Sequence, residues 1–289
     1  MNSLQLHQSI NLLVLLLLGV MFSNVHLAWM DILVILLFTL FIEHFFLYVN
    51  KHRPFYFSYA SLTTAVGVMV LIYANTLWIY FVIITLGLAQ KHFLLLKEQH
   101  FFNPSNFALI MALFFFYDES HMIAGQFGDE ALFSMIVFVL ALSILVRVGR
   151  FFVPFFFLFF YLLFQYLLIV HYDPVVTFQE IYHRFFSVTF MLFIYFMLTD
   201  PRVTPNRWWE QFVFIFLVVL VATLLDRFYG YRVQHLFLSL FFFSFWVHYR
   251  KFQNLSLLEL KFVMTILFLL FVMLFVIQSQ EPYYFEMNG

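Results

Sequence analysis

The chain has 289 residues, of which 65% are hydrophobic and only 10% charged, and its formal net charge is −1. Soluble domains are roughly half apolar and a quarter charged, so this chain has too few polar side chains to cover a surface that faces water. It is therefore predicted to be an all-α integral membrane protein whose surrounding partner is the lipid bilayer. The absence of cysteine excludes disulfides and thiolate metal sites, and the charge balance excludes a nucleic-acid partner.

Polar breaks divide the chain into apolar segments. A lipid-spanning helix needs roughly 20 apolar residues, and several of the segments are shorter. The sequence predicts a bundle of about ten or eleven transmembrane helices, with one re-entrant half-helix in the smaller count. The segments are 9–25, 29–49, 57–75, 77–93, 105–117, 131–147, 151–171, 185–199, 208–225, 233–249 and 261–279.

Basic residues gather in every second loop between these segments. One set of loops holds Lys51, Arg53, Lys91, Lys97, Arg147, Arg150, Arg202, Arg207, Arg250, Lys251 and Lys261. The alternate loops hold only Arg184, Arg227 and Arg232. Lys and Arg favour the cytoplasmic side of a membrane. The pattern therefore predicts a multi-pass protein of the inner (cytoplasmic) membrane, with the N-terminus cytoplasmic and the C-terminus outside.

Within the second segment, past its midpoint, lies the ionisable pair Glu43-His44. Ionisable side chains are costly in lipid and mark functional sites by default. Glu43 is close enough to the inner side to meet Lys51, Arg53 or another inner base. Two interpretations stay open, a buried structural pair and a proton or ion relay. Gln165, in the seventh segment, is expected to form a polar contact between helices.

The first polar break is "HFFNPSNFALIM", from His100 to Met111. Proline favours the first position of a helix and an extended residue before it. Asn103 or Ser105 is therefore expected to cap a helix that begins near Pro104 and runs from Asn106. The N–H groups and dipole at such a helix start suit an anion or a flavin carbonyl.

The second break is "TDPRVTPN", from Thr199 to Asn206, on the same predicted side of the membrane. Thr199 or Asp200 is expected to act as a cap, with Pro201 opening a short turn. The stretch Thr204-Pro205 then leads into the next helix. Each break also fits a simpler interpretation, a tight inner loop with good caps and basic anchors.

The two breaks together resemble a known family. "KHFLLLKEQHFFNPSNFAL", from Lys91, and "MLTDPRVTPN", from Met197, look like the paired signatures of the NqrB/RnfD family. This family comprises membrane subunits of the sodium-translocating NADH:quinone oxidoreductase and of the Rnf electron-transport complex. "SLTTAVGVMVLIY", from Ser61, resembles the stretch that precedes the first signature. The likeness extends to Gly230, and it is nearest to the short, UnbU-like branch of the family.

The resemblance implies two inverted five-helix repeats with broken helices. It also implies a membrane subunit of an electron-transport system, an oxidoreductase subunit coupled to ion movement and assembled with other membrane or electron-transfer subunits. The expected organisation is one transmembrane domain, with an N-terminal hairpin (1–56), a core (57–230) and C-terminal helices (231–289).

A flavin, as FMN or riboflavin, or a quinone is expected to bind at the cytosolic-side breaks, with Lys91 or His92 balancing its reduced form. The family attaches FMN covalently to a Thr within a Gly-Ala-Thr motif, which this sequence lacks. The neighbours of Thr177 do not match that motif either, so binding is expected to be non-covalent. The residues expected to bind the cofactor are Lys91, His92, Asn103, Pro104, Ser105, Asn106, Thr199, Asp200, Pro201, Thr204 and Pro205.

Two other functions remain open from the residues alone. A transporter or channel-like protein would keep the fold without redox chemistry. A b-type haem protein would use two of the 11 histidines on facing helices. No metal-ion site is expected, and no motif of a hydrolase or nucleotide-binding loop identifies catalytic residues.

Overall fold

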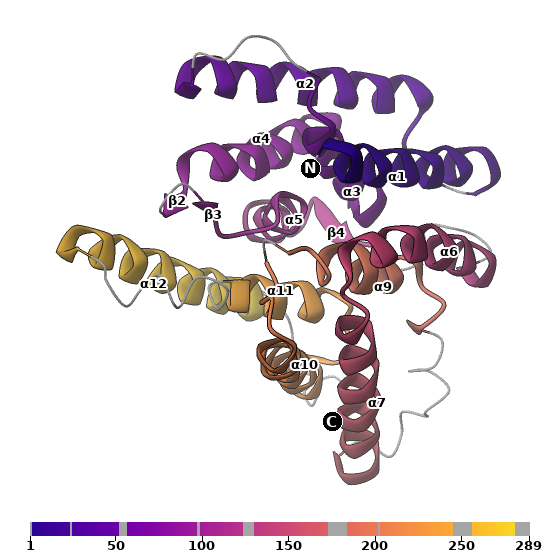
Figure 1. Ribbon diagram of the computed structural model, residues 1–289, viewed down its shortest axis with the longest axis vertical. Helices are drawn as coiled ribbons and strands as arrows, with labels where there is room; N and C mark the ends of the chain where they lie inside the picture. The colour runs from indigo at the N-terminus through magenta and orange to yellow at the C-terminus, as the bar shows by residue number, and fades with distance from the viewer. Residues whose placement is uncertain are drawn as a thin grey trace.

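A computed structural model describes residues 2–23, 25–51, 57–96, 99–123, 130–172, 184–201, 203–244 and 256–280. Within these ranges the chain forms eleven helices, with α9 and the π-helical turn η1 counted as one, and four very short strands. The prediction of an all-helical fold is therefore confirmed. Figure 1 shows α1 to α5 in the upper half of the molecule and most of the later helices in the lower half.

The first half contains five helices and four strands of two or three residues. In chain order they are α1 (Asn2–Phe22), α2 (Trp29–Lys51), α3 (Tyr59–Leu71), β1 (Ile72–Ala74), α4 (Leu77–Phe93), β2 (Leu95–Leu96), β3 (Gln99–His100), α5 (Pro104–Phe115) and β4 (Ser120–Met122).

The second half is entirely helical where it is described. Its elements are α6 (Glu130–Val148), α7 (Phe152–Tyr172), α9 (Val188–Leu192), η1 (Phe193–Met197), α10 (Trp208–Tyr229), α11 (Gln234–Phe243) and α12 (Leu257–Ser279). Each of the eleven predicted segments corresponds to one helix.

The helices fall into two classes by length. Six are long and apolar enough to cross a membrane, and they lie in α1, α2, α6, α7, α10 and α12. The other five apolar helices have only 10–17 residues: α3, α4, α5, the α9–η1 helix and α11. The described chain thus has six helices of spanning length, where the sequence predicts ten or eleven spans. The difference arises because the polar breaks cut several segments short.

A helix too short to cross the membrane ends inside it, where lipid cannot hydrogen-bond its terminal backbone groups. In the first half, such groups form hydrogen bonds within the protein. The strand β1 follows α3 and pairs antiparallel with β4, which follows α5, with Tyr73 opposite His121. The backbone N–H of Asn75 extends this ladder by donating to the carbonyl of Glu119 at 3.1 Å. The ends of α3 and α5 are thereby held together inside the protein.

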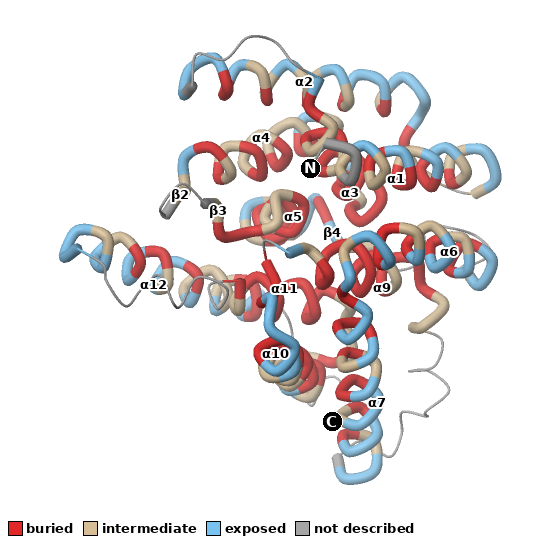
Figure 2. Tube along the Cα trace, viewed as in Figure 1, coloured by how far each residue is buried: buried red, intermediate tan, exposed pale blue. Residues whose placement is uncertain are grey.

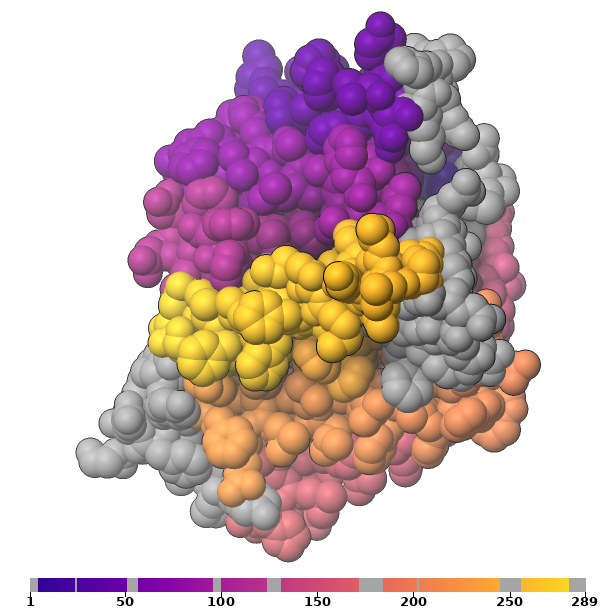
Figure 3. Space-filling model, turned by 90° about the vertical axis from the view of Figure 1, so that its left-hand side faces the viewer, coloured from indigo at the N-terminus to yellow at the C-terminus, as the bar shows by residue number. Residues whose placement is uncertain are grey.

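The helices pack in the same order in both halves. In the first half, α1 packs on α3, α2 on α4, and α4 on α5. In the second half, α6 packs on α9, α7 on α10, and α10 on α11. The short helices α5 and α11 contact each other at the centre, where Figure 2 colours them mostly as buried. In Figure 3, α12 lies as a yellow band between the two halves.

Large apolar side chains cover the outside of the long helices. Phe268, Phe271 and Phe275 on α12 are each more than 60% exposed, and so is Phe155 on α7. In a chain of this composition these side chains face acyl chains, where their exposure carries no hydrophobic penalty. Polar side chains instead gather in the interior, which makes their partners informative.

Candidate functional site

The first break forms a capped helix start. Asn103 is the N-cap of α5, and its side-chain oxygen accepts hydrogen bonds from the backbone N–H groups of Ser105 at 3.0 Å and Asn106 at 3.2 Å. Pro104 occupies the first helical turn, where its missing N–H costs nothing. The predicted cap is confirmed, with Asn103 rather than Ser105 in the role.

The second break differs from the prediction. Thr199 and Asp200 follow the C-terminal end of η1, and they do not begin a helix. The backbone carbonyl of Asp200 accepts from the N–H groups of Val203 and Thr204, which closes a turn. The next helix, α10, starts at Trp208, and its N-cap Arg207 makes no side-chain cap. The predicted capping role of Thr199 or Asp200 is wrong, because the two prolines hold the chain in a turn that ends before α10.

The two breaks meet in space although 97 residues separate Asn103 from Asp200. The side-chain amide of Asn103 donates a hydrogen bond to Oδ2 of Asp200, with a nitrogen–oxygen distance of 2.9 Å. The same amide therefore caps α5 through its oxygen and holds the second break through its nitrogen. This contact places both motifs at one site.

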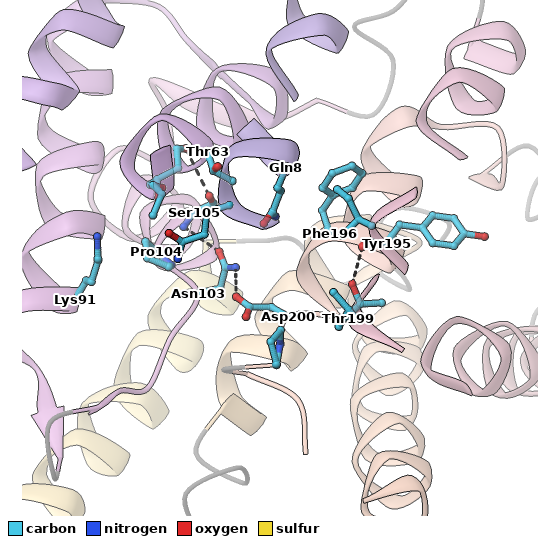
Figure 4. Close-up of a pocket in the computed structure, with 16 residues that line it drawn as sticks. Gln8, Thr63, Lys91, Asn103, Pro104, Ser105, Tyr195, Phe196, Thr199 and Asp200 are labelled. Atoms are coloured by element: carbon cyan, nitrogen blue, oxygen red, sulfur yellow. Dashed lines mark hydrogen bonds between the residues drawn. The ribbon is translucent and has the colours of Figure 1, made fainter. Parts of the chain in front are cut away.

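A cavity of about 350 Å³ opens beside this contact, between the two halves of the molecule. This volume lies at the lower end of the range for small-molecule sites, roughly 300–1,000 Å³. Figure 4 shows hydroxyl, amide and aromatic side chains gathered around it. The lining residues are Gln5, Gln8, Ala60, Thr63, Thr64, Lys91, Asn103, Pro104, Ser105, Ile144, Val148, Tyr195, Phe196, Thr199, Asp200 and Pro201.

Most of the predicted cofactor-binding residues line the cavity. The seven that do so are Lys91, Asn103, Pro104, Ser105, Thr199, Asp200 and Pro201. Four others, His92, Asn106, Thr204 and Pro205, lie outside it. Asn106 is buried and donates from its side-chain nitrogen to the carbonyl of Phe237 on α11 at 3.3 Å, so it joins two central helices.

Thr204 and Pro205 belong to the turn after the cavity, and Arg150 holds this turn. The Arg150 guanidinium donates to the carbonyl of Thr204 at 3.0 Å and to that of Pro205 at 3.2 Å, and it also bonds Oδ1 of Asn206. Burial lowers the pKa of Arg150 from its ordinary value, while the nearby carboxylate of Asp200 acts in the opposite direction. The sequence gives Arg150 only as an inner basic residue, and nothing local indicates these partners.

Glu43 is the centre of a buried ionic cluster behind the cavity wall. Its carboxylate has no exposed surface and accepts from Lys91 Nζ at 2.6 Å and His92 Nε2 at 3.1 Å. The hydroxyl of Ser58 adds a longer bond of 3.3 Å. We call Glu43, Lys91, His92 and Ser58 the Glu43 cluster. The predicted inner base is thus Lys91 on α4, and this residue also lines the cavity.

His44 takes no part in the described contacts of the Glu43 cluster. Its Nδ1 contacts the carbonyl of Leu40, one turn earlier on the same helix, at 2.6 Å. Adjacent residues on a helix point in different directions, which explains why Glu43 and His44 separate. The described contacts therefore link Glu43 to the cavity wall through Lys91.

Several lining residues carry little sequence signal. Thr63 and Thr64 are the two threonines of "SLTTAVGVMVLIY", and their hydroxyls bond backbone carbonyls one turn earlier on α3. Tyr195 and Phe196 lie within the π-helical turn η1, a rare form that is often found at functional sites. A π-turn is not recognisable from residue types alone, so these positions could not be predicted.

No known protein family matches the chain, and no curated protein does either. The likeness to the NqrB/RnfD signatures therefore rests on the sequence motifs alone. Thr177, considered above for covalent flavin, lies outside the described residues. Within the described ranges, no three His, Asp or Glu side chains gather as ligands for a metal ion.

Proposed function

We propose that this membrane protein is a subunit of an electron-transport system of the NqrB/RnfD type, which binds a flavin or a quinone non-covalently in the cavity. The observation that carries the proposal is the hydrogen bond between Asn103 and Asp200 at the cavity wall. It joins the two motifs that prompted the family comparison. A shared polar corner with a cavity is the arrangement that a small-molecule site requires.

The chemistry of the wall favours a neutral, flat ring over a phosphate. Asn103 already occupies the first free N–H groups of α5, and Asp200 adds a negative charge beside them. The donors left for a ring carbonyl are the side-chain amides of Gln5 and Gln8, because the Ser and Thr hydroxyls of the wall already donate to backbone carbonyls. The ring of Phe196 is available for stacking, whereas the ring of Tyr195 points away from the cavity and packs on Phe138 (Figure 4). An isoalloxazine or quinone ring fits this corner, whereas the phosphate of FMN would have to lie elsewhere.

Lys91 supplies the positive charge that a reduced, anionic ring needs. Its ammonium group bonds Glu43, and its side chain belongs to the cavity wall with 16% of its surface exposed. A ring that gains negative charge would attract Lys91 away from Glu43. His92 lies on the other oxygen of Glu43, so its effect on the ring would be indirect.

The proposal includes an architecture of two inverted five-helix repeats, α1–α5 and α6–α11, followed by α12. The support is the repeated packing order and the short helices at the third and fifth places of each unit. Because a unit with five crossings ends on the opposite side of the membrane from where it began, the next unit has the inverted orientation. Inverted-repeat transporters bind ligands between their repeats, where helices are broken.

The same features support a second candidate, a transporter or channel that keeps this fold without redox chemistry. The buried Glu43 cluster favours it, because charged groups inside a membrane protein often lie on ion or proton pathways. The two candidates differ in whether the cavity takes a redox-active ring.

The test is the visible spectrum of the purified protein, followed by titration with riboflavin and with a short-chain quinone. The electron-transport proposal expects a bound flavin spectrum, or saturable binding of one of the two probes. A colourless protein that binds neither probe would contradict it and favour the transporter. A Soret band would instead indicate haem.

The matched variants are Asn103→Ser, which keeps a capping oxygen but cannot reach Asp200, and His121→Asn, an exposed change on β4 away from the cavity lining. Binding in the cavity predicts weaker affinity for the first variant and unchanged affinity for the second.

A further inference from the structure

A second buried ionic cluster lies outside the lining of the cavity. Asp226 is near the end of α10, and at 1.5 Å per residue it is about 27 Å along the helix from Trp208. Asp226 is 3% exposed, and its partner His235 on α11 has no exposed surface. We call Asp226, His235, Gln165 and Arg184 the Asp226 cluster.

The carboxylate of Asp226 is fully engaged. Its Oδ1 lies 2.7 Å from Nδ1 of His235 and accepts the backbone N–H of Arg232 at 3.2 Å. Its Oδ2 accepts from Nε2 of Gln165 at 2.8 Å and lies 3.6 Å from the Arg184 guanidinium. The predicted polar contact of Gln165 between helices is thus confirmed, and it joins α7 to α10.

This arrangement determines which ring nitrogen of His235 carries the hydrogen. An ionised carboxylate only accepts hydrogen bonds, so Nδ1 carries the hydrogen and Nε2 of the neutral ring presents a lone pair. That Nε2 atom is buried, and it has no hydrogen-bond partner among the described residues. Buried polar atoms without partners are costly and few. An aspartate that orients a histidine with its other nitrogen free is a common arrangement for accepting a proton or a ligand.

The surroundings set the charge balance of the cluster. Asp226 and Arg184 cancel each other while His235 is neutral. Arg227 points over the ring of Phe228, and α5, which packs on α11, has no titratable side chain. The described contacts place these titratable or charged groups around the cluster: Tyr161 on α7, Arg184 before α9, Asp226 and Arg227 on α10, and Tyr231 and Arg232 in the following turn.

We propose that His235 is a proton-binding site, in which Nε2 takes up a proton and the charged ring replaces Arg184 as the ionic partner of Asp226. His235 is enclosed and cannot leave, whereas Arg184 is 21% exposed and lies 3.6 Å from the carboxylate, beyond normal hydrogen-bond length. Alternative contacts for Arg184 are already in place, the Tyr161 hydroxyl at 3.1 Å and the Tyr231 ring at 5.1 Å. The proton is supplied by solvent water.

The position of the cluster supports a role in moving charge. The Glu43 cluster joins α2 to α4, and the Asp226 cluster joins α7 to α10, the pair with the same place in the packing order of the second half. Each cluster thus joins a buried carboxylate to one histidine and to one partly exposed Lys or Arg side chain. The proposal holds whichever ligand the cavity takes.

The test follows the ring nitrogens of histidine by NMR, in protein labelled at histidine nitrogen and embedded in lipid nanodiscs. We expect the signal assigned to His235 to show the Nδ1–H form with bare Nε2 at high pH, and to become protonated at Nε2 as the pH is lowered from about 8 to about 5. In Arg184→Gln the competing cation is gone, so protonation should move to higher pH by on the order of one unit or more.

Assignment uses His235→Asn, because the Asn side chain keeps an N–H donor for Asp226. His235→Gln is the second assignment variant if that protein does not fold. His121→Asn, an exposed change, must leave the assigned signal untouched. The proposal is overturned if Nε2 stays bare throughout this pH range, if it carries the hydrogen at high pH, or if Arg184→Gln leaves the midpoint unchanged.

Discussion

Lys91 takes part in two structures at once, because its ammonium group bonds Glu43 while its side chain forms part of the cavity wall. Glu43 is sealed from solvent, so its charge is stabilised by Lys91, His92 and Ser58 rather than by water. Anything that draws Lys91 toward the cavity therefore changes the electrostatics of the Glu43 cluster. The ligand site and the buried acid are coupled through one side chain.

Removing the positive partner alone should be costly. Lys91→Met leaves a buried carboxylate with weaker partners, and we expect unfolding to become easier by on the order of 3 kcal/mol. The double variant Glu43→Gln/Lys91→Met removes both charges and should recover most of that loss. Denaturant unfolding in detergent, arranged as a double-mutant cycle, measures the coupling. Lys261→Met, at an exposed position of α12, is the control with an expected effect below about 0.5 kcal/mol.

Substitutions can separate the two functions of Asn103, which are to cap α5 and to bond Asp200. Asn103→Ala removes the cap of α5, which costs about 1 kcal/mol, whereas Asn103→Ser retains a capping oxygen and most of that stability. Both variants lose the bond to Asp200, so both should bind riboflavin or quinone more weakly. Unfolding and binding are measured on the same preparations. Wild-type affinity in Asn103→Ser would show that the bond between the two breaks does not support the site.

Local and distant contacts differ in how well the sequence predicts them. The cap at Asn103 was predictable because its partners are two and three residues away. The partners of Glu43 were predictable only as an unspecified inner base, since Lys91 follows 48 residues later. Arg150 and its three carbonyl contacts carried no signal at all. Tertiary packing determines such pairs, and residue types along one segment do not encode it.

At the scale of elements, the crossing of α4 and α5 determines where the first break lies. Gly87 is at this crossing, and a Cβ added there would lie 2.6 Å from the carbonyl oxygen of Pro104 and 3.0 Å from Cβ of Ala108. Contacts this short with backbone are not tolerated, so any larger side chain must push the two helices apart. Pro104 lines the cavity, so such a shift would also move its wall.

Gly87→Ala should therefore destabilise the protein by about 1–3 kcal/mol through overpacking and should also weaken ligand binding. Gly67→Ala is the comparison for which we expect a smaller loss of stability, because its new Cβ would meet the flexible hydroxyl of Ser105 at 3.0 Å rather than backbone. Thermal unfolding and probe titration of both variants give the measurement. A smaller effect at Gly87 than at Gly67 would mean that the helices yield more easily than the contact distances imply.

Element positions were largely predictable, and element lengths were not. Hydropathy locates each of the eleven helices because a lipid-facing or buried helix needs an apolar run. It cannot tell that Ile72–Ala74 leaves α3 to pair with Ser120–Met122, because such a pairing depends on the other chain segment being present. The π-turn η1 was missed because residue types alone do not distinguish it from an α-helix, and Tyr195 and Phe196 were missed with it.

At the scale of the whole molecule, the cavity exists only because the two halves meet. Its wall draws on α1, α3, α4 and the start of α5 from the first half, and on α6, η1 and the second break from the other. Motif reasoning could supply only the residues of the breaks. The glutamines Gln5 and Gln8 and the apolar Ile144 and Val148 come from helices that resemble any other span. Their role follows from assembly of the halves.

The orientation of the molecule can be tested directly, because the chain has no cysteine to interfere with thiol labelling. Asp118, after α5, and Arg207, before α10, are both exposed, and the basic-residue pattern predicts that they lie on opposite sides of the membrane. In intact cells a membrane-impermeant maleimide should label Asp118→Cys and should label Arg207→Cys only after permeabilisation. The opposite pattern would invert the molecule and put both breaks outside. Equal labelling would mean that one of the segments 131–147, 151–171 and 185–199 does not cross, and the inverted repeats would then fail.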